Sequence, residues 1–177
     1  SLSYKFELIG SPSDVLPHSS DAEHQSYRPD ADAANVRLKA SGTYSRPVLD
    51  HFQFEKSLTA QWSPNTLLGQ LQQSYGGNET LRAYRNRSFF ADSGLSGSFT
   101  LKLNPFSYKS LLLQPEQFID YAYVNQNSTV GQNQFRPDAE WFFNYGLGLV
   151  FRYRDLQGGV RYAFDLNDPD RHFTSFQ

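Results

Sequence analysis

Cysteine and methionine are both absent from this 177-residue sequence. Without cysteine, neither a disulfide framework nor a thiolate-ligated metal site can form. The histidines lack the close spacing that metal ligands need; they are His18, His24, His51 and His172. The sequence therefore predicts neither a metal nor another cofactor.

A strong charge imbalance is also missing. The 16 Lys and Arg residues nearly balance the 18 Asp and Glu residues, for a net charge of −2, so nothing predicts a nucleic-acid partner. Ser93 lies in an Asp-Ser-Gly sequence. A nucleophilic serine of the elbow type needs a turn between a strand and a helix, which the sequence does not predict here. No other enzyme motif is found, and we expect the protein not to be an enzyme.

Long hydrophobic runs are missing as well. The mean hydropathy is −0.59, and no stretch approaches the roughly 20 apolar residues of a membrane-spanning helix. The chain opens with neither Met nor a signal peptide, so we expect a mature portion or a piece of a longer protein. These values are compatible with a transmembrane barrel, because its alternating strands hide their hydrophobicity from a window average.

Aromatic residues, in contrast, are abundant: 15 Phe, 11 Tyr and 2 Trp make up 16% of the chain. Most of them fall in segments where apolar and polar residues alternate, which is typical of β-strands with one apolar face. Seven such segments are found, at 2–8, 36–44, 52–62, 95–103, 118–123, 141–153 and 160–166. An eighth strand is expected from about Phe173 onward.

Alternation of this kind occurs in soluble sandwiches and in outer-membrane barrels, whose apolar row faces lipid. Several segments run for about 9 to 13 residues, the length of a tilted membrane-spanning strand, whereas soluble strands average about 5 or 6. The polar row carries charges that a wet lumen tolerates; they are Lys5, Glu7, Arg37, Lys39, Glu55, Lys102, Asp120, Arg152, Arg161 and Asp165.

Long and short connections between the predicted strands alternate along the chain. Long connections at about 10–34, 64–94 and 125–138 alternate with short ones at about 45–51, 105–112 and 154–158. Outer-membrane barrels have short periplasmic turns and longer outer loops in this same alternation. The fold prediction is therefore all-β: an antiparallel transmembrane β-barrel, of which this chain supplies seven or eight strands.

One long connection carries a motif. Residues 75–94, YGGNETLRAYRNRSFFADSG, follow the strand end Gln-Trp-Ser-Pro at 61–64 and precede a strand at 118–123. The motif residues of the loop are Gly76, Gly77, Leu81, Arg82, Ala83 and Tyr84, and those of the strand are Phe118, Asp120 and Ala122. Their order and spacing resemble the outer-membrane transporters of two-partner secretion, the ShlB/FhaC/HecB haemolysin secretion/activation family. Ala83 and Ala122 stand where the family has glycine.

The resemblance implies a fold and a location. Residues 1–177 would be the C-terminal part of a 16-stranded barrel in the bacterial outer membrane, in contact with its lipid. The loop at about 64–94 would fold into the lumen. The barrel would export a partner protein, of haemolysin or adhesin type, that is unfolded while it passes.

The resemblance also implies a gating pair, in which Arg82 of the loop binds Asp120 on the inner wall. The residues give an independent check, because Ile119, Tyr121 and Tyr123 form an apolar row and Asp120 must then face the lumen. A charge-assisted bond between the two would pin the loop. A static brace is the alternative role for this pair.

Two further predictions concern exposed residues. Trp62 and Trp141 are expected in aromatic girdles at the membrane interface. Arg85 and Arg87 are expected to be solvated loop charges. Three alternative functions are left open by the sequence: a barrel-assembly insertase of the same superfamily, a passive porin, and a soluble β-sandwich binding module.

Overall fold

The computed structural model describes residues 1–12, 20–28, 30–77, 80–84, 88–127, 139–167 and 172–176. Its elements, in chain order, are β1 (Leu2–Ser11), α1 (Asp21–Tyr27), β2 (Asn35–Val48), β3 (Phe52–Trp62), η1 (Gly69–Leu71), β4 (Gln73–Gly76), η2 (Arg82–Tyr84), β5 (Ser88–Ala91), β6 (Ser93–Leu103), β7 (Phe106–Tyr108), β8 (Leu111–Asn125), β9 (Ala139–Tyr153), β10 (Leu156–Asp165) and β11 (His172–Phe176). Within the described ranges, no helix is long and apolar enough to cross a membrane.

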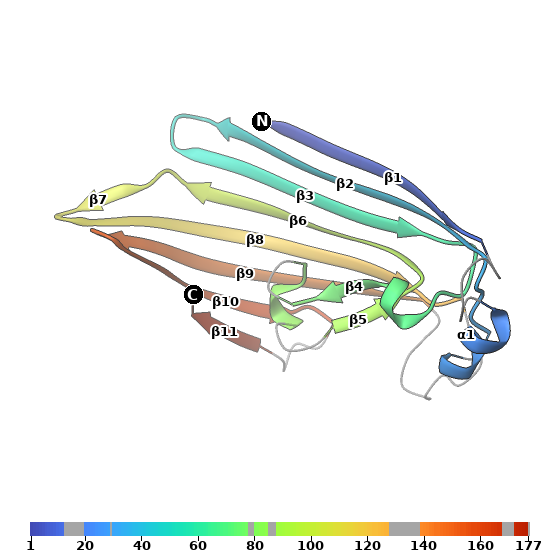
Figure 1. The fold of residues 1–177 in the computed structure, drawn as a ribbon. Coiled ribbons are helices and arrows are strands. Elements are labelled where there is room, and N and C mark those ends of the chain that lie inside the picture. Colours follow the sequence, from blue (N-terminus) through green and yellow to red (C-terminus); the bar gives the residue numbers. More distant parts are fainter. Residues whose placement is uncertain are drawn as a thin grey trace.

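The main sheet is antiparallel and follows the order β1-β2-β3-β6-β8-β9-β10-β11, with β7 paired to β8. The sheet is strongly curved, and β4, β5 and η2 lie within its curve (Figure 1). Short turns lie at one end of the strands, and α1 lies at the other (Figure 1). The predicted antiparallel barrel fold is confirmed, in the form of a partial barrel wall; the total number of strands in the complete barrel stays a prediction.

Tight turns join neighbouring strands at one end of the wall. Leu49, Lys109 and Arg154, the first residues of these turns, have φ angles of 59°, 56° and 52°. Positive φ at the first turn residue matches the twist of antiparallel hairpins. The turns fix the register, in which Val48 lies opposite Phe52 and Tyr153 opposite Leu156.

The convex face of the sheet is apolar. Large hydrophobic side chains are exposed along it, among them Leu2, Tyr4, Phe6, Leu8, Leu38, Leu58, Phe99, Ile119, Leu147 and Phe164. Aromatic rings on neighbouring strands stack there, as in Phe99 against Tyr121, with ring centroids 5.7 Å apart. An exposed apolar surface of this extent marks an interaction surface, and in a barrel wall it is the face that contacts lipid.

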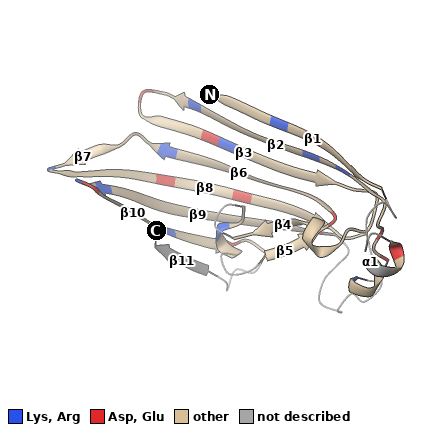
Figure 2. Cartoon of the chain, in the orientation of Figure 1, with Lys and Arg blue, Asp and Glu red and all other residues tan. Residues whose placement is uncertain are grey.

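The concave face is polar and carries paired charges. Charged residues recur along the strands instead of gathering at one end (Figure 2). The buried core of this face forms where the connection between β3 and β6, residues 63–92, packs on β8, β9 and β10. The core residues are Tyr75, Leu81, Ala83, Tyr84, Ala91, Phe118, Ala122, Val124, Phe142 and Ala163. The connection is thus the inner layer of the molecule.

Several elements differ from the sequence prediction. β2, β8 and β9 have 14, 15 and 15 residues, so they are longer than expected. The connection at 63–92 holds the β4–β5 hairpin and two 3₁₀ turns, and the first connection holds the seven-residue α1. These elements are too short to produce a hydrophobic period that could be detected in sequence.

Candidate functional site

Arg82 and Asp120 meet on the concave face. Arg82 opens η2 in the inner connection, and Asp120 lies on β8 with its side chain buried against the loop. The Arg82 backbone N–H donates to Asp120 Oδ2 at 3.0 Å, Nε donates to both carboxylate oxygens at 3.1 and 3.0 Å, and Nη2 donates to Oδ1 at 2.6 Å. One carboxylate therefore binds both the main chain and the side chain of Arg82.

Two further contacts surround the Arg82 guanidinium. Arg82 Nη2 also donates to Thr100 Oγ1 at 3.2 Å, and the guanidinium carbon lies 3.5 Å from the centroid of the Phe118 ring. The Arg82 and Asp120 side chains are only 13% and 1% exposed. A guanidinium held by a carboxylate on one side and by an aromatic face on the other keeps most of its interactions when water is excluded.

Asn144 on β9 binds the same turn. With its amide oxygen directed at the loop, Asn144 accepts from the N–H groups of Arg82 at 3.0 Å and Ala83 at 2.6 Å, and its NH₂ donates to the Asp120 carbonyl at 3.1 Å. Asn144 is fully buried and lies directly opposite Asp120 in the sheet. Its amide therefore gives the buried Ala83 N–H a partner and shares the Arg82 N–H with Asp120.

Tyr84 extends the contact to a third strand. Its hydroxyl donates to the buried Asp165 at the end of β10. Its ring packs edge-to-face on Phe89 and on Phe142, with centroids 5.4 and 5.5 Å apart, and these two rings stack on each other at 4.4 Å. The turn at 82–84 is thus bound to β8, β9 and β10.

The glycine pair of the motif shapes the entry to this turn. Gly76 and Gly77 have φ angles of 118° and 79°, which side chains rarely allow. Gly77 N–H donates to the Tyr84 carbonyl at 3.0 Å, and Thr80 Oγ1 donates to the Gly76 carbonyl at 2.6 Å. These bonds hold Gly76 and Gly77 against the segment at 80–84, in which Leu81 is buried.

The two alanines that replace family glycines fit the structure without strain. Ala83 and Ala122 are both 0% exposed, and neither is among the described residues with positive φ. Their methyl groups belong to the core beneath the loop. A glycine conformation is therefore not needed at either position.

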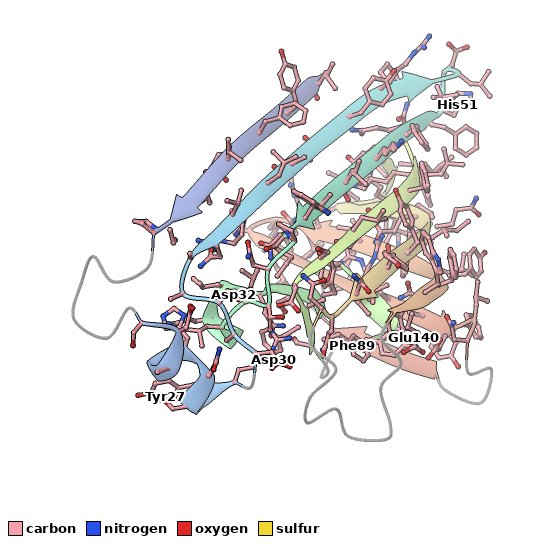
Figure 3. All side chains as sticks on the ribbon, turned by 90° about the vertical axis from the view of Figure 1, so that its right-hand side faces the viewer. Tyr27, Asp30, Asp32, His51, Phe89 and Glu140 are labelled. Atoms are coloured by element: carbon pink, nitrogen blue, oxygen red, sulfur yellow. The ribbon has the colours of Figure 1, made fainter. Side chains whose placement is uncertain are left out.

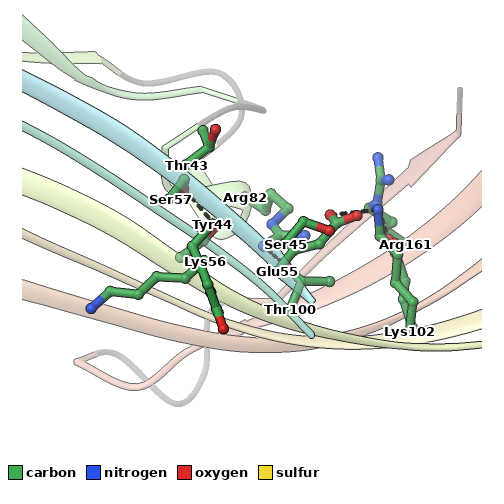
Figure 4. Close-up of a pocket in the computed structure, with 12 residues that line it drawn as sticks. Thr43, Tyr44, Ser45, Glu55, Lys56, Ser57, Arg82, Thr100, Lys102 and Arg161 are labelled. Carbon is green, nitrogen blue, oxygen red and sulfur yellow. Dashed lines mark hydrogen bonds and ion pairs between the residues drawn. The ribbon is translucent and has the colours of Figure 1, made fainter. Parts of the chain in front are cut away.

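A polar cavity of about 450 Å³ lies beside Arg82 on the concave face (Figure 4). Two ion pairs line it: Lys102 Nζ lies 2.6 Å from Glu55 Oε2, and Arg161 binds Glu116. The Glu116 side chain is 1% exposed. Mixed charges that pair with one another leave a wall that is polar but has no large field of one sign.

The remaining predicted positions are spread over the molecule. Trp62 and Trp141 lie at the strand ends near α1, and their side chains are 56% and 46% exposed. Arg85 and Arg87 lie outside the described residues. In the described part of the chain, no cluster of His, Asp and Glu could hold a metal ion.

The sequence placed Arg161 and Asp165 in the polar row, but it did not indicate Asp165 and Asn144 as partners of the loop or Arg161 as the partner of Glu116. Alternation tells which face a side chain is on, whereas pairing across strands depends on register. In a sequence, register can be predicted from the type of turn that joins two strands. The two-residue turns at 109–110 and 154–155 contain no glycine or asparagine, so the sequence does not indicate where these turns lie.

Comparison with known proteins gives two findings. The family profile described as haemolysin secretion/activation protein ShlB/FhaC/HecB matches residues 15–149. Among solved structures, CdiB from Escherichia coli is similar, with a TM-score of 0.74 and 19% sequence identity over 99% of this chain. The chain spans 32% of the length of CdiB. No match was found among the curated proteins.

Proposed function

Because the chain belongs to the ShlB/FhaC/HecB family of haemolysin secretion/activation proteins, we propose that it forms part of an outer-membrane pore that exports a partner protein. The partner would be a haemolysin or adhesin that crosses the pore unfolded. Transport, not catalysis, is the activity. The pore would be gated by the connection between β3 and β6, held closed by Arg82 on Asp120.

The two faces of the wall support a pore in a membrane. The convex face presents apolar and aromatic side chains, as lipid requires, and the concave face presents hydroxyl groups, amides and paired charges. A polar wall offers an unfolded chain weak and exchangeable contacts, without a deep apolar trap. The energy for net movement would come from elsewhere, such as folding of the exported protein outside the cell.

The observation that carries the proposal is the anchoring of the inner connection by a buried ion pair. Arg82 contacts Asp120 through four hydrogen bonds, and breaking a buried pair of this kind by removing one partner costs about 3 to 5 kcal/mol. A passive porin has no need of such a pair across its lumen. Displacement of the loop separates this pair, so a ligand that opens the pore must bind the displaced loop more tightly than the docked one.

The test uses the full-length transporter with its partner protein. Arg82→Ala is expected to raise the single-channel conductance in planar bilayers and to change the rate of export at least tenfold, because the loop loses the charged anchor that holds the pore closed. Asp120→Asn should have a similar effect, and the double variant should be no worse than either alone, since both remove one interaction.

Arg152→Ala is the matched control, because Arg152 lies on the same sheet but, among the described residues, its hydrogen-bond partner is Gln157 near a short turn, at 3.0 Å. Heat-modifiable mobility on gels establishes that each variant is folded. If the folded Arg82→Ala protein exports at the wild-type rate with wild-type conductance, the gating role is wrong and the pair is a static brace.

A further inference from the structure

A second buried carboxylate lies at the far end of the same connection. Asp92 is the residue before β6 and its side chain is fully buried. It accepts hydrogen bonds from Arg28 Nη1 at 2.6 Å and Nη2 at 2.9 Å, from Leu67 N at 2.9 Å, from Gln72 Nε2 at 3.1 Å, and from Asn127 N at 2.8 Å. Five donors thus converge on one side chain.

The donors belong to three different connections. Arg28 follows α1 in the connection from β1 to β2, Leu67 and Gln72 lie between β3 and β6, and Asn127 lies after β8. In the sheet order, β3 and β6 separate β2 from β8. Asp92 therefore ties together segments that leave the wall several strands apart, all at the end where α1 lies (Figure 1).

Other bonds reinforce this junction. Asp32, which lies beside α1 in Figure 3, donates its N–H to the Thr66 carbonyl at 2.9 Å and accepts from Thr66 N at 3.1 Å. Asn127 Nδ2 donates to the carbonyls of Ser63 at 2.9 Å and Asn65 at 2.8 Å. These contacts close the three connections over one another at the mouth of the concave face.

Arg28 is the member of the junction that balances the negative charge of Asp92. Among the described donors to Asp92, only Arg28 carries a charge, and its side chain is 18% exposed. Burial acts to raise the pKa of Asp92, but the bonds from Arg28, Asn127 and Leu67 outweigh it and hold this pKa below its ordinary value. The carboxylate is therefore ionised at neutral pH, and loss of Arg28 would leave a buried charge without a counter-ion.

We propose that Arg28 and Asp92 form an outer latch, which closes the mouth of the pore and must part before an exported chain can leave it. This inference rests on the proposed export function. The outer latch differs from the Arg82–Asp120 anchor: that anchor holds the loop to the wall inside the lumen, whereas Arg28–Asp92 holds the three connections to one another. Both carboxylate contacts act on the connection at 63–92, so full displacement of that segment requires both to open.

A reversible covalent lock tests the latch, because the sequence has no cysteine to interfere. Asp32→Cys with Thr66→Cys joins two connections whose backbones already share a hydrogen bond, a separation suited to a disulfide. In the full-length transporter, the oxidised pair should lower export at least tenfold, and a reducing agent should restore it.

The matched control is Ala40→Cys with Ala60→Cys. These alanines lie opposite each other on β2 and β3 within the wall, which does not have to open. Their cross-link should leave export unchanged. Export at the control rate from a transporter whose 32–66 cross-link is verified by mass spectrometry would overturn the proposal.

A second measurement does not depend on a partner protein. Arg28→Gln keeps a polar side chain but removes the charge and the two guanidinium bonds to Asp92, so channel openings in planar bilayers should become at least tenfold more frequent. Unchanged gating of folded Arg28→Gln would refute the latch. If the wild-type protein exports no partner while Arg28→Gln still opens the channel, the export function fails and the latch stands.

Discussion

Arg82 binds Asp120 with its main chain as well as its side chain, and this has a consequence for substitution. The backbone N–H bond at 3.0 Å does not involve the side chain, so it can form with any residue at position 82 except proline. The guanidinium bonds and the contact with the Phe118 ring do not. Lysine offers a single point charge without a planar fork, so it cannot reproduce three hydrogen bonds and a stacked face. Docking of the turn is shared among Asp120, Asn144 and Asp165, and no single side chain carries all of it.

The share of Tyr84 can be measured separately. Tyr84→Phe removes the hydroxyl that binds Asp165 but keeps the ring between Phe89 and Phe142. Loss of a hydrogen bond to a buried carboxylate costs about 1 to 3 kcal/mol, so hydrogen exchange of the amides at 80–84 should become roughly 10- to 100-fold faster. Tyr108→Phe is the control, since Tyr108 is exposed on β7. Equal exchange rates in wild type and Tyr84→Phe would contradict a docking role for the hydroxyl.

The sequence predicted the Arg82–Asp120 contact but not the contact between Arg28 and Asp92. The face of Asp120 followed from the alternation of its neighbours, and resemblance supplied Arg82 as its partner; the structure brings the two together, and their role in gating stays a prediction. The sequence did not predict that Arg28 and Asp92 form an ion pair. Their positions are 64 residues apart, and no periodic pattern relates a residue after a short helix to one before a strand.

On the inner face of strands β8 and β9, large side chains of β8 lie opposite glycines of β9. Phe118 lies opposite Gly146, and Glu116 lies opposite Gly148. A Cβ atom at position 148 would lie 2.7 Å from the Glu116 side chain. These glycines therefore provide the space in which the inward side chains of β8 lie flat beneath the loop.

Gly146→Ala is expected to destabilise both the wall and the loop. Its Cβ would overlap the Phe118 ring and lie 2.5 Å from the Tyr162 carbonyl oxygen. Overpacking of this kind costs about 1 to 3 kcal/mol, measurable by urea unfolding of the full-length protein in micelles. Gly10→Ala is the control, because nothing lies within 4 Å of a Cβ there. An equal unfolding free energy for the two variants would contradict a steric role for Gly146.

The long strands were predictable and the small elements were not. Membrane-length alternation located β1, β2, β3, β6, β8, β9 and β10, because one face must be apolar throughout. The connection at 63–92 folds differently: its β4–β5 hairpin is stabilised by burial of Tyr75, Leu81 and Ala91 against the wall. Burial also raises the pKa of the Tyr75 hydroxyl. Such tertiary packing leaves no local pattern in the sequence.

The whole molecule has two faces with opposite solvent preferences. Trp62 and Trp141 lie on the convex face near the end that carries α1, and Tyr123 packs on Trp141 with ring centroids 5.0 Å apart. Amphipathic rings of this kind concentrate at the level of lipid headgroups. We therefore expect both tryptophans at the same membrane interface.

Fluorescence quenching by brominated lipids measures this depth. In full-length variants that keep only Trp62 or only Trp141, bromine near the headgroups should quench more strongly than bromine at the chain ends. The expected contrast is about twofold, because an interfacial indole lies within a few ångströms of the headgroup level. Stronger quenching by the deeper bromine, or none from either lipid, would place these residues away from the interface.

The order of the strands in the sheet follows the order of the chain, so the wall can assemble hairpin by hairpin from local contacts. The pairing of β3 with β6 has to close the longest of the connections between neighbouring strands. Residues 63–92 connect β3 to β6, whereas residues 49–51 connect β2 to β3. Closing a segment about ten times longer costs roughly 2 kcal/mol more in chain entropy. Early docking of Arg82 on Asp120 would shorten that segment, so the pair that anchors the loop to the wall would also favour the pairing of β3 with β6 during folding.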